Sequence, residues 1–170
     1  MSDQIFRSWC VENADDALAL AAASDVFDLQ QLALNRFVAE FSCRTLVCEP
    51  DGEPYETLGV RVGFFFDPEH LRKVDPQTLI TILQPTNIWH PNGIGPFLCI
   101  GAVLPGTPLS EILYRTYDVL SFNNYTPNEF DSLNAHACSW VRRNQDRFPL
   151  ESRPLKRRSS AGAAIEMEVQ

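Results

Sequence analysis

A loop sequence in the middle of the chain, from Trp89 to Ile100, constrains the fold more than any other feature. Two prolines and two glycines interrupt it: Pro91, Gly93, Gly95 and Pro96. Because these residues disfavour a regular helix and a central strand, the segment must be an irregular loop. It also carries an imidazole, a carboxamide and a thiol, at His90, Asn92 and Cys99. Catalytic groups often sit on loops that a scaffold holds in place, so the segment predicts a reactive site.

Composition narrows the class of protein. With 170 residues, 45% of them hydrophobic, the chain can form one domain with a real core. A net charge of −8 argues against nucleic-acid binding, which needs clustered basic residues. The five cysteines are an odd number without paired metal spacing, and no signal peptide or apolar run of membrane length is present. We therefore expect a reduced, cytoplasmic protein that engages neither nucleic acid nor membrane.

The N-terminal part of the chain has a helical composition. From Asn13 to Phe41 it is rich in alanine and leucine and contains no proline or glycine. Ser24 followed by Asp25 is a helix-start signal that divides this stretch. The apolar residues beyond it predict a main amphipathic helix from about Asp25 to Phe41. We accordingly expect an N-terminal extension at residues 1–24 and a domain at residues 25–148.

The pattern then changes to that of strands. Thr45–Cys48 and Tyr55–Phe66 are separated by a turn sequence, and apolar residues alternate along the second of them. A third short apolar run, Leu79–Leu83, follows a polar loop. These runs predict an antiparallel meander of three strands beside one helix.

Helical patterns return after Cys99. Pro108 suits the first turn of a helix that continues to Leu120, and a second helix is predicted from about Glu129 to Arg147. Residues 149–170 are basic and then rich in serine, alanine and glycine, which predicts a flexible C-terminal tail. The order of elements is that of an α+β fold.

The spacing of three motifs resembles that of the ubiquitin-conjugating enzyme (UBC-like) family. These are His90-Pro91-Asn92, then Cys99 after a glycine-containing loop, then Asp131-Ser132-Leu133-Asn134 near the last helix. The resemblance covers roughly residues 25–148. His90 and Cys99 are nine positions apart, one fewer than is usual in the family, and Ile100-Gly101 stands where Leu-Asp is usual.

The resemblance implies a UBC-like fold with an N-terminal helix, an antiparallel meander, an irregular active-site loop and two C-terminal helices. It implies an enzyme that accepts a ubiquitin-like modifier from an activating enzyme as a thioester on Cys99 and transfers it to an amine of a target protein. The divergence is similar to that of bacterial members, which often belong to antiphage defence operons. No cofactor is implied.

The candidate residues also suit this chemistry in their own right. A cysteine can carry an acyl group because thioester exchange between similar thiols is nearly isoenergetic. The Asn92 carboxamide is a candidate either for stabilising the oxyanion or for holding the loop. Asp131 is a candidate for orienting the incoming amine. His90 and Pro91 are expected to support the loop.

Two other classes of function remain open at this point. One is a non-catalytic binding scaffold of the same fold, which the presence of Cys99 disfavours. The other is a cysteine hydrolase that pairs Cys99 with His70, His90 or His136, and this requires an imidazole within hydrogen-bond reach of the thiol. A metal site is not expected, because the histidines and cysteines show no ligand pairs at suitable spacing.

Overall fold

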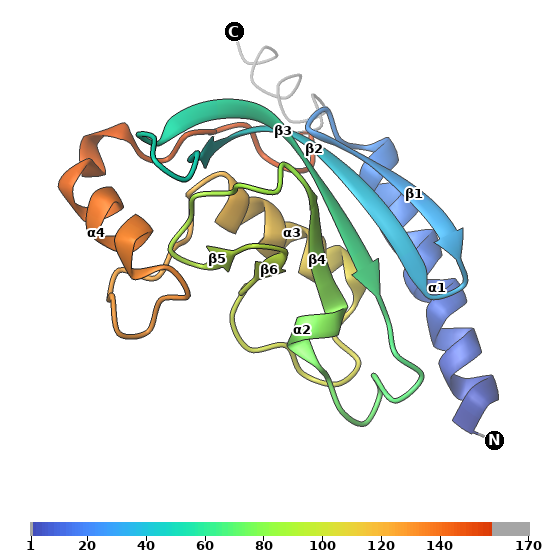
Figure 1. Cartoon of the computed structure of the whole chain (residues 1–170). Helices are drawn as coiled ribbons and strands as arrows, with labels where there is room; N and C mark the ends of the chain where they lie inside the picture. The colour runs from blue at the N-terminus through green and yellow to red at the C-terminus, as the bar shows by residue number, and fades with distance from the viewer. Residues whose placement is uncertain (1, 158–170) are drawn as a thin grey trace, which may run out of the picture.

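The computed structural model describes residues 2–157, which form an α+β structure around one antiparallel sheet (Figure 1). The elements in chain order are α1 (Ser2–Ala22), β1 (Phe27–Ala33), β2 (Arg36–Val47), β3 (Tyr55–Phe65), α2 (Pro76–Leu79), β4 (Ile80–Gln84), β5 (Gly93–Ile94), β6 (Phe97–Leu98), α3 (Leu109–Leu120), α4 (Ala135–Arg143) and a 3-10 turn (Gln145–Arg147). Strands β1 to β4 pair in sequence order, and β5 pairs with β6 in a small hairpin. The predicted fold class is confirmed, with four strands in the meander where the sequence predicted three.

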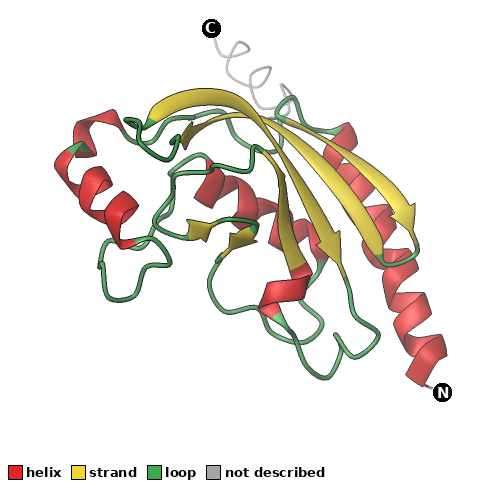
Figure 2. Ribbon diagram, viewed as in Figure 1, coloured by secondary structure: helices red, strands yellow, loops and turns green. Residues whose placement is uncertain are grey.

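The helices α1 and α3 cover one face of the sheet (Figure 2). Buried side chains on α1 recur every three or four residues: Phe6, Cys10, Ala14, Ala17 and Leu20. This spacing aligns them on one stripe of the helix, which packs into the same core as the strands. In addition, the Asn13 side chain accepts a hydrogen bond from the Leu109 backbone N–H at 2.6 Å and so ties α1 to the start of α3. Helix α1 is therefore part of the packed core.

The helix predicted from Asp25 to Phe41 is wrong. This stretch forms a hairpin of β1 and β2, in which Phe27 lies opposite Phe41 and Ala33 opposite Arg36. Alternate side chains of β2 are buried, among them Phe37, Ala39, Phe41 and Cys43. Alternation is the periodicity of a strand. Burial of these side chains beneath the helices thus outweighs the helical propensity of the local sequence.

The last helix is shorter than predicted. It extends from Ala135 to Arg143, whereas the sequence predicted Glu129 to Arg147. Asn134 is its N-cap, since its side chain accepts a hydrogen bond from the backbone N–H of Ala137 at 3.0 Å. Residues 129–134 are therefore a turn that precedes the helix.

The first part of the predicted C-terminal tail is packed. Leu155 is only 2% exposed, and Ser24 Oγ donates a hydrogen bond to its carbonyl oxygen. The Tyr117 hydroxyl donates to the Arg153 carbonyl at 2.6 Å, and the Arg157 N–H donates to the Ala23 carbonyl at 2.9 Å. The prediction of a flexible tail does not hold for this segment, and residues 158–170 lie outside the described part of the chain.

No helix within residues 2–157 is long and apolar enough to cross a membrane.

Candidate functional site

The loop predicted to carry the site is anchored at both of its ends. At its start, Ile88 forms a bridge with Val47, and the Trp89 N–H donates to the Leu46 carbonyl at 2.8 Å. Further along, the loop folds into the β5–β6 hairpin, whose turn contains Gly95 at a φ of 56°. The Ile82 N–H of β4 donates to the Pro96 carbonyl at 2.8 Å. The central sheet thus holds the loop that ends at Cys99.

His90 lies in the interior beneath this loop. Its side chain is fully buried, and its ring centroid lies 4.2 Å from that of Phe122. The Nδ1 atom accepts a hydrogen bond from the Asn92 backbone N–H at 2.9 Å. Burial lowers the pKa of His90 to about 3, so the imidazole is neutral near pH 7. These contacts fit the predicted role in supporting the loop.

Asn92 joins the site loop to the segment after α3. Its Nδ2 donates to Thr126 Oγ1 at 2.9 Å, and its Oδ1 accepts from the Thr126 backbone N–H at 2.8 Å. The side chain is 9% exposed. Both ends of the carboxamide are therefore engaged within the protein, which favours the loop-holding role over the oxyanion role. Thr126 lies between the two helices that the sequence predicted after Cys99, and sequence analysis did not single it out.

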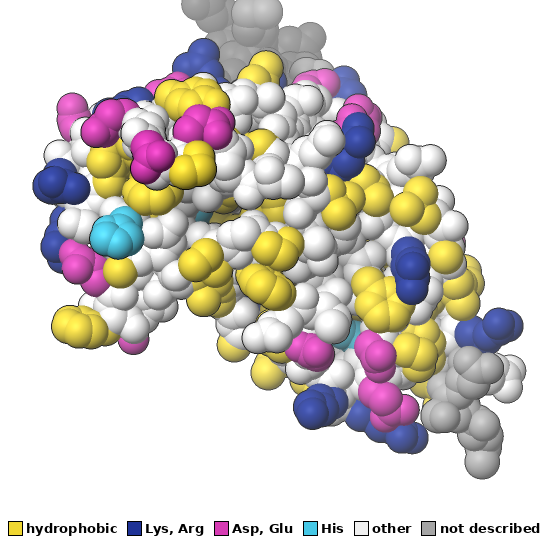
Figure 3. All heavy atoms as spheres, viewed as in Figure 1, with side chains coloured by type: hydrophobic (Ala, Val, Ile, Leu, Met, Phe, Trp, Pro, Cys, Tyr) yellow, Lys and Arg dark blue, Asp and Glu magenta, His cyan; other side chains and the backbone are white. Residues whose placement is uncertain are grey.

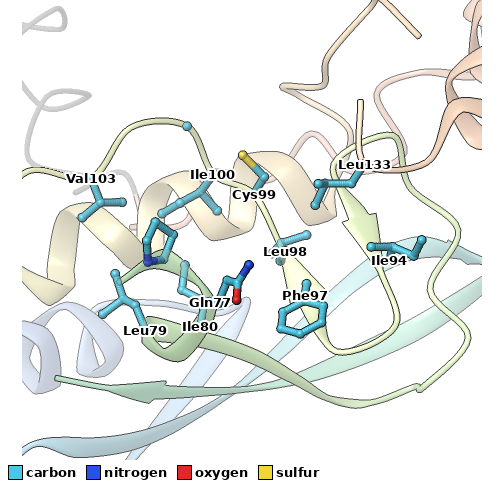
Figure 4. A pocket seen from close by; sticks show the side chains of 12 residues that line it. Gln77, Leu79, Ile80, Ile94, Phe97, Leu98, Cys99, Ile100, Val103 and Leu133 are labelled. Atoms are coloured by element: carbon cyan, nitrogen blue, oxygen red, sulfur yellow. The ribbon is translucent and has the colours of Figure 1, made fainter. Parts of the chain in front are cut away.

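Cys99 is exposed. Its N–H donates to the Asn92 carbonyl at 2.8 Å, which closes the loop around the hairpin. The side chain lines a groove of about 380 Å³, where it lies between Ile100 and Leu133 (Figure 4). Nothing in the described part of the chain forms a hydrogen bond or ion pair with its sulfur. The thiol is thus open to an incoming acyl group.

None of the three histidines is arranged as a base for this thiol. His90 uses Nδ1 for the loop backbone. His70 is buried elsewhere, between Trp9 and Phe66, and burial lowers its pKa. His136 lies on α4 and lines a different cavity. The arrangement required of a cysteine hydrolase is therefore absent from residues 2–157.

Asp131 lies on the turn that leads into α4. Its Oδ2 accepts a hydrogen bond from Asn128 Nδ2 at 3.0 Å, and the rest of the carboxylate is exposed. The Pro91 carbonyl accepts hydrogen bonds from the N–H groups of Leu133 and Asn134, at 2.9 and 3.1 Å. This contact holds the turn against the site loop and brings Leu133, rather than Asp131, to the wall of the groove. Sequence reasoning missed Leu133 as a wall residue, and its position in the Asp-x-Leu-Asn motif was the available signal.

The other cysteines differ from Cys99 in exposure. Cys10, Cys43 and Cys138 are buried, and burial raises the pKa of Cys10 to about 11 and that of Cys43 to about 12. Cys48 is half-buried, and its thiol donates to two carbonyls of its own turn. Cys99 is therefore the most accessible of the five thiols. Over residues 2–157, no three histidine, cysteine or acidic residues are grouped so that they could hold a metal ion.

No protein-family model matches the chain, and no curated protein matches it. Among solved structures, the chain is similar to human ubiquitin-conjugating enzyme E2 G1, with 16% sequence identity and a TM-score of 0.42. The match covers 71% of this chain and 94% of the human chain. Similarity at this level assigns no role to any residue, so the roles proposed below depend on the contacts of this chain itself.

Proposed function

We propose that this chain is a conjugating enzyme of the ubiquitin-conjugating type, with Cys99 as the carrier of a ubiquitin-like modifier. The observation that supports this proposal most is the exposure of the Cys99 thiol at the end of a loop that backbone hydrogen bonds hold in place. Within the described residues, no side chain forms a hydrogen bond with this thiol. The partners in this proposal are an activating enzyme, the modifier and a target protein.

The proposed reaction has two acyl-transfer steps. In the first, the Cys99 thiolate attacks the thioester that joins the modifier to the activating enzyme, and the thiolate of that enzyme leaves. In the second, a neutral amine of the target attacks the new thioester, the Cys99 thiolate leaves, and the proton lost by the amine passes to solvent. Thioester exchange keeps the acyl group activated between the two steps. No cofactor takes part in either step.

The neighbouring residues have supporting roles in this scheme. Asn92 and His90 hold the loop through their hydrogen bonds, and the Pro91 carbonyl holds the turn that carries Asp131. Asp131 would orient the amine of the target, because an exposed carboxylate attracts the ammonium form of that amine before the ammonium group is desolvated. The bacterial and antiphage setting implied by the sequence resemblance is part of the proposal, and the genes next to this one would test it.

The alternative is a binding scaffold of the same architecture without catalysis. A scaffold has no use for an exposed thiol beside an open groove, whereas an acyl carrier requires both. The two classes differ in one measurable property, which is covalent capture of a modifier.

Cys99 substitutions test the proposal. With an activating enzyme, ATP and the candidate modifier, Cys99→Ser should accumulate a stable oxyester and Cys99→Ala should accumulate nothing. Cys48→Ser is the matched control, because it removes the other partly exposed thiol, and it should load normally. Loading that survives Cys99→Ala, or that is lost in Cys48→Ser, would contradict the assignment.

A further inference from the structure

A second cavity lies at the end of the sheet, between α4 and the turn that joins β2 to β3 (residues 48–54) (Figure 1). Its volume is about 700 Å³, within the range of sites that hold ligands, roughly 300–1,000 Å³. The turn contributes Glu53, α4 contributes Trp140 and Arg143, and the site loop contributes Trp89. Over residues 2–157, no residue lines both this cavity and the groove beside Cys99. The two are therefore separate candidate sites.

Two tryptophans give this cavity an aromatic surface. The Trp140 ring is held by its neighbours, since the Arg147 guanidinium carbon lies 5.1 Å from its centroid and the Phe148 ring centroid lies 6.3 Å away. Trp89 is held by its backbone N–H, which donates to the Leu46 carbonyl at 2.8 Å. The indole Nε1 of Trp89 is buried and has no hydrogen-bond partner within the described residues. Because a buried donor without an acceptor costs free energy, a ligand that brings an acceptor to this indole gains a hydrogen bond.

The two walls of the cavity carry opposite charges, and on the face shown in Figure 3 acidic and basic side chains both gather at this end of the molecule, at the left. On the turn, the Glu53 carboxylate forms no hydrogen bond or ion pair with any described residue. Burial and the carboxylates of Glu53 and Glu49 raise the pKa of the Cys48 thiol, which reflects the negative potential of this wall. On α4, Arg143 Nε donates to the Ser139 carbonyl at 3.2 Å, and its two Nη groups have no acceptor within residues 2–157. The cavity thus offers a ligand one carboxylate and one guanidinium.

We propose that this cavity is a docking site for an extended segment of a partner protein in which a cationic and an anionic residue are neighbours, with an aromatic residue beside them. Successive side chains of an extended segment point in opposite directions. One charge can therefore reach Glu53 while the next reaches Arg143, and an aromatic ring can pack against Trp89 or Trp140. A ligand of a single sign, such as a nucleotide phosphate, would be attracted by one wall and repelled by the other. The inference goes beyond the proposed function, because a segment bound in this cavity leaves Cys99 accessible.

Two-dimensional NMR of the indole N–H groups tests the proposal with a defined probe, the peptide acetyl-Phe-Lys-Glu-Phe-amide. Trp89 and Trp140 line the cavity, whereas Trp9 lies on α1 and serves as the internal control. The peptide should shift the resonances of Trp89 and Trp140 and leave that of Trp9 unchanged. Replacement of the lysine or the glutamate of the peptide by glutamine should weaken binding about threefold each, and replacement of both about tenfold. Equal affinities for the four peptides would overturn the inference.

Charge-neutralising variants assign each charge of the peptide to its wall. Glu53→Gln should remove the preference for lysine over glutamine in the peptide and keep the preference for glutamate, and Arg143→Gln should do the reverse. Asp51→Asn and Arg142→Gln are the matched controls, because both residues are exposed neighbours that do not line the cavity. The controls should keep both preferences. A control that weakens binding as much as its matched variant would indicate general electrostatic attraction and contradict a docking site.

Peptide binding to Cys99→Ala separates this inference from the proposed function. The variant has no thiol at the proposed carrier position, and its affinity for the peptide should equal that of the wild type. Loss of binding in this variant would place the peptide in the groove beside Cys99 and contradict the inference. Tighter binding of ATP or of acetyl-Phe-Lys-Lys-Phe-amide, or the absence of any shift at millimolar peptide, would contradict it as well. Failure of Cys99 to load a modifier, in contrast, would count against the proposed function alone.

Discussion

Replacement of Asn92 by alanine should destabilise the protein by disconnecting the site loop from the segment after α3. The substitution removes two hydrogen bonds to Thr126, at 2.9 and 2.8 Å, one of which satisfies the Thr126 backbone N–H. A hydrogen bond of this kind contributes about 0.5–1.5 kcal/mol net. The two together predict a loss of about 2 kcal/mol in the free energy of unfolding, with both loading and discharge of Cys99 reduced.

A matched substitution separates the two roles considered for Asn92. In Asn92→Asp, the carboxylate can still accept hydrogen bonds from the N–H and the hydroxyl of Thr126, but it can no longer donate to an oxyanion. Urea denaturation should show that Asn92→Asp recovers most of the stability lost in Asn92→Ala. If Asn92 holds the loop, single-turnover discharge should recover with it. Loss of an oxyanion donor would instead slow discharge by roughly 10²–10³ in both variants.

A double-mutant cycle completes this test. Thr126→Ala removes only the hydrogen bond to the Thr126 hydroxyl, which Asn92→Ala also removes. The effects of the two substitutions on unfolding should therefore not add fully, and a coupling energy of about 1 kcal/mol is expected. An Asn92→Ala variant whose unfolding free energy stays within about 0.5 kcal/mol of the wild type would refute the reasoning, because that is the range of an ordinary surface substitution.

Three further predictions concern other parts of the molecule. Leu155→Ala should lower the free energy of unfolding by about 2–4 kcal/mol in urea denaturation, because the side chain is buried; no change would mean that this segment is not packed. Because the pKa of His90 is depressed in the folded state, between about pH 6.5 and about pH 3 the unfolded state binds a proton that the folded state does not, so the free energy of unfolding should fall by about 1.4 kcal/mol per pH unit as the pH is lowered. His90→Gln should flatten this slope in denaturation curves measured across this pH range. An unchanged slope in the variant would show that His90 does not cause the pH dependence. Asp131→Asn should slow single-turnover discharge to an amine without slowing loading, and equal slowing of both steps would argue for a structural role.

The fold class could be predicted from sequence because its strongest patterns are local. The alternation in Tyr55–Phe66 and the helical spacing up to Leu120 each gave an element close to that observed. The β1–β2 hairpin could not be found in this way, because its sequence contains good helix formers and no glycine or proline at the Leu34-Asn35 turn. Its strand character depends on contacts with the helices that cover the sheet, and local propensity does not report such contacts.

The candidate site could be proposed from sequence where its residues lie in one short segment. The candidate side chains of the Trp89–Ile100 loop, and the prolines and glycines that make this loop irregular, could be read directly from the sequence. The partnership of Asn92 with Thr126 could not, because it joins residues 34 positions apart. The same holds for the groove, whose walls come from three separate segments of the chain.

Covalent capture of a modifier by the Cys99 thiol is the central requirement of the proposed function, and intact mass spectrometry tests it directly. After incubation with an activating enzyme, ATP and the candidate modifier, the protein should gain the mass of one modifier less one water, mapped to Cys99. A thiol reductant should remove this mass, because its thiolate takes the acyl group by thioester exchange. A protein that keeps its original mass while the activating enzyme is fully loaded, or an adduct on another residue, would contradict the account.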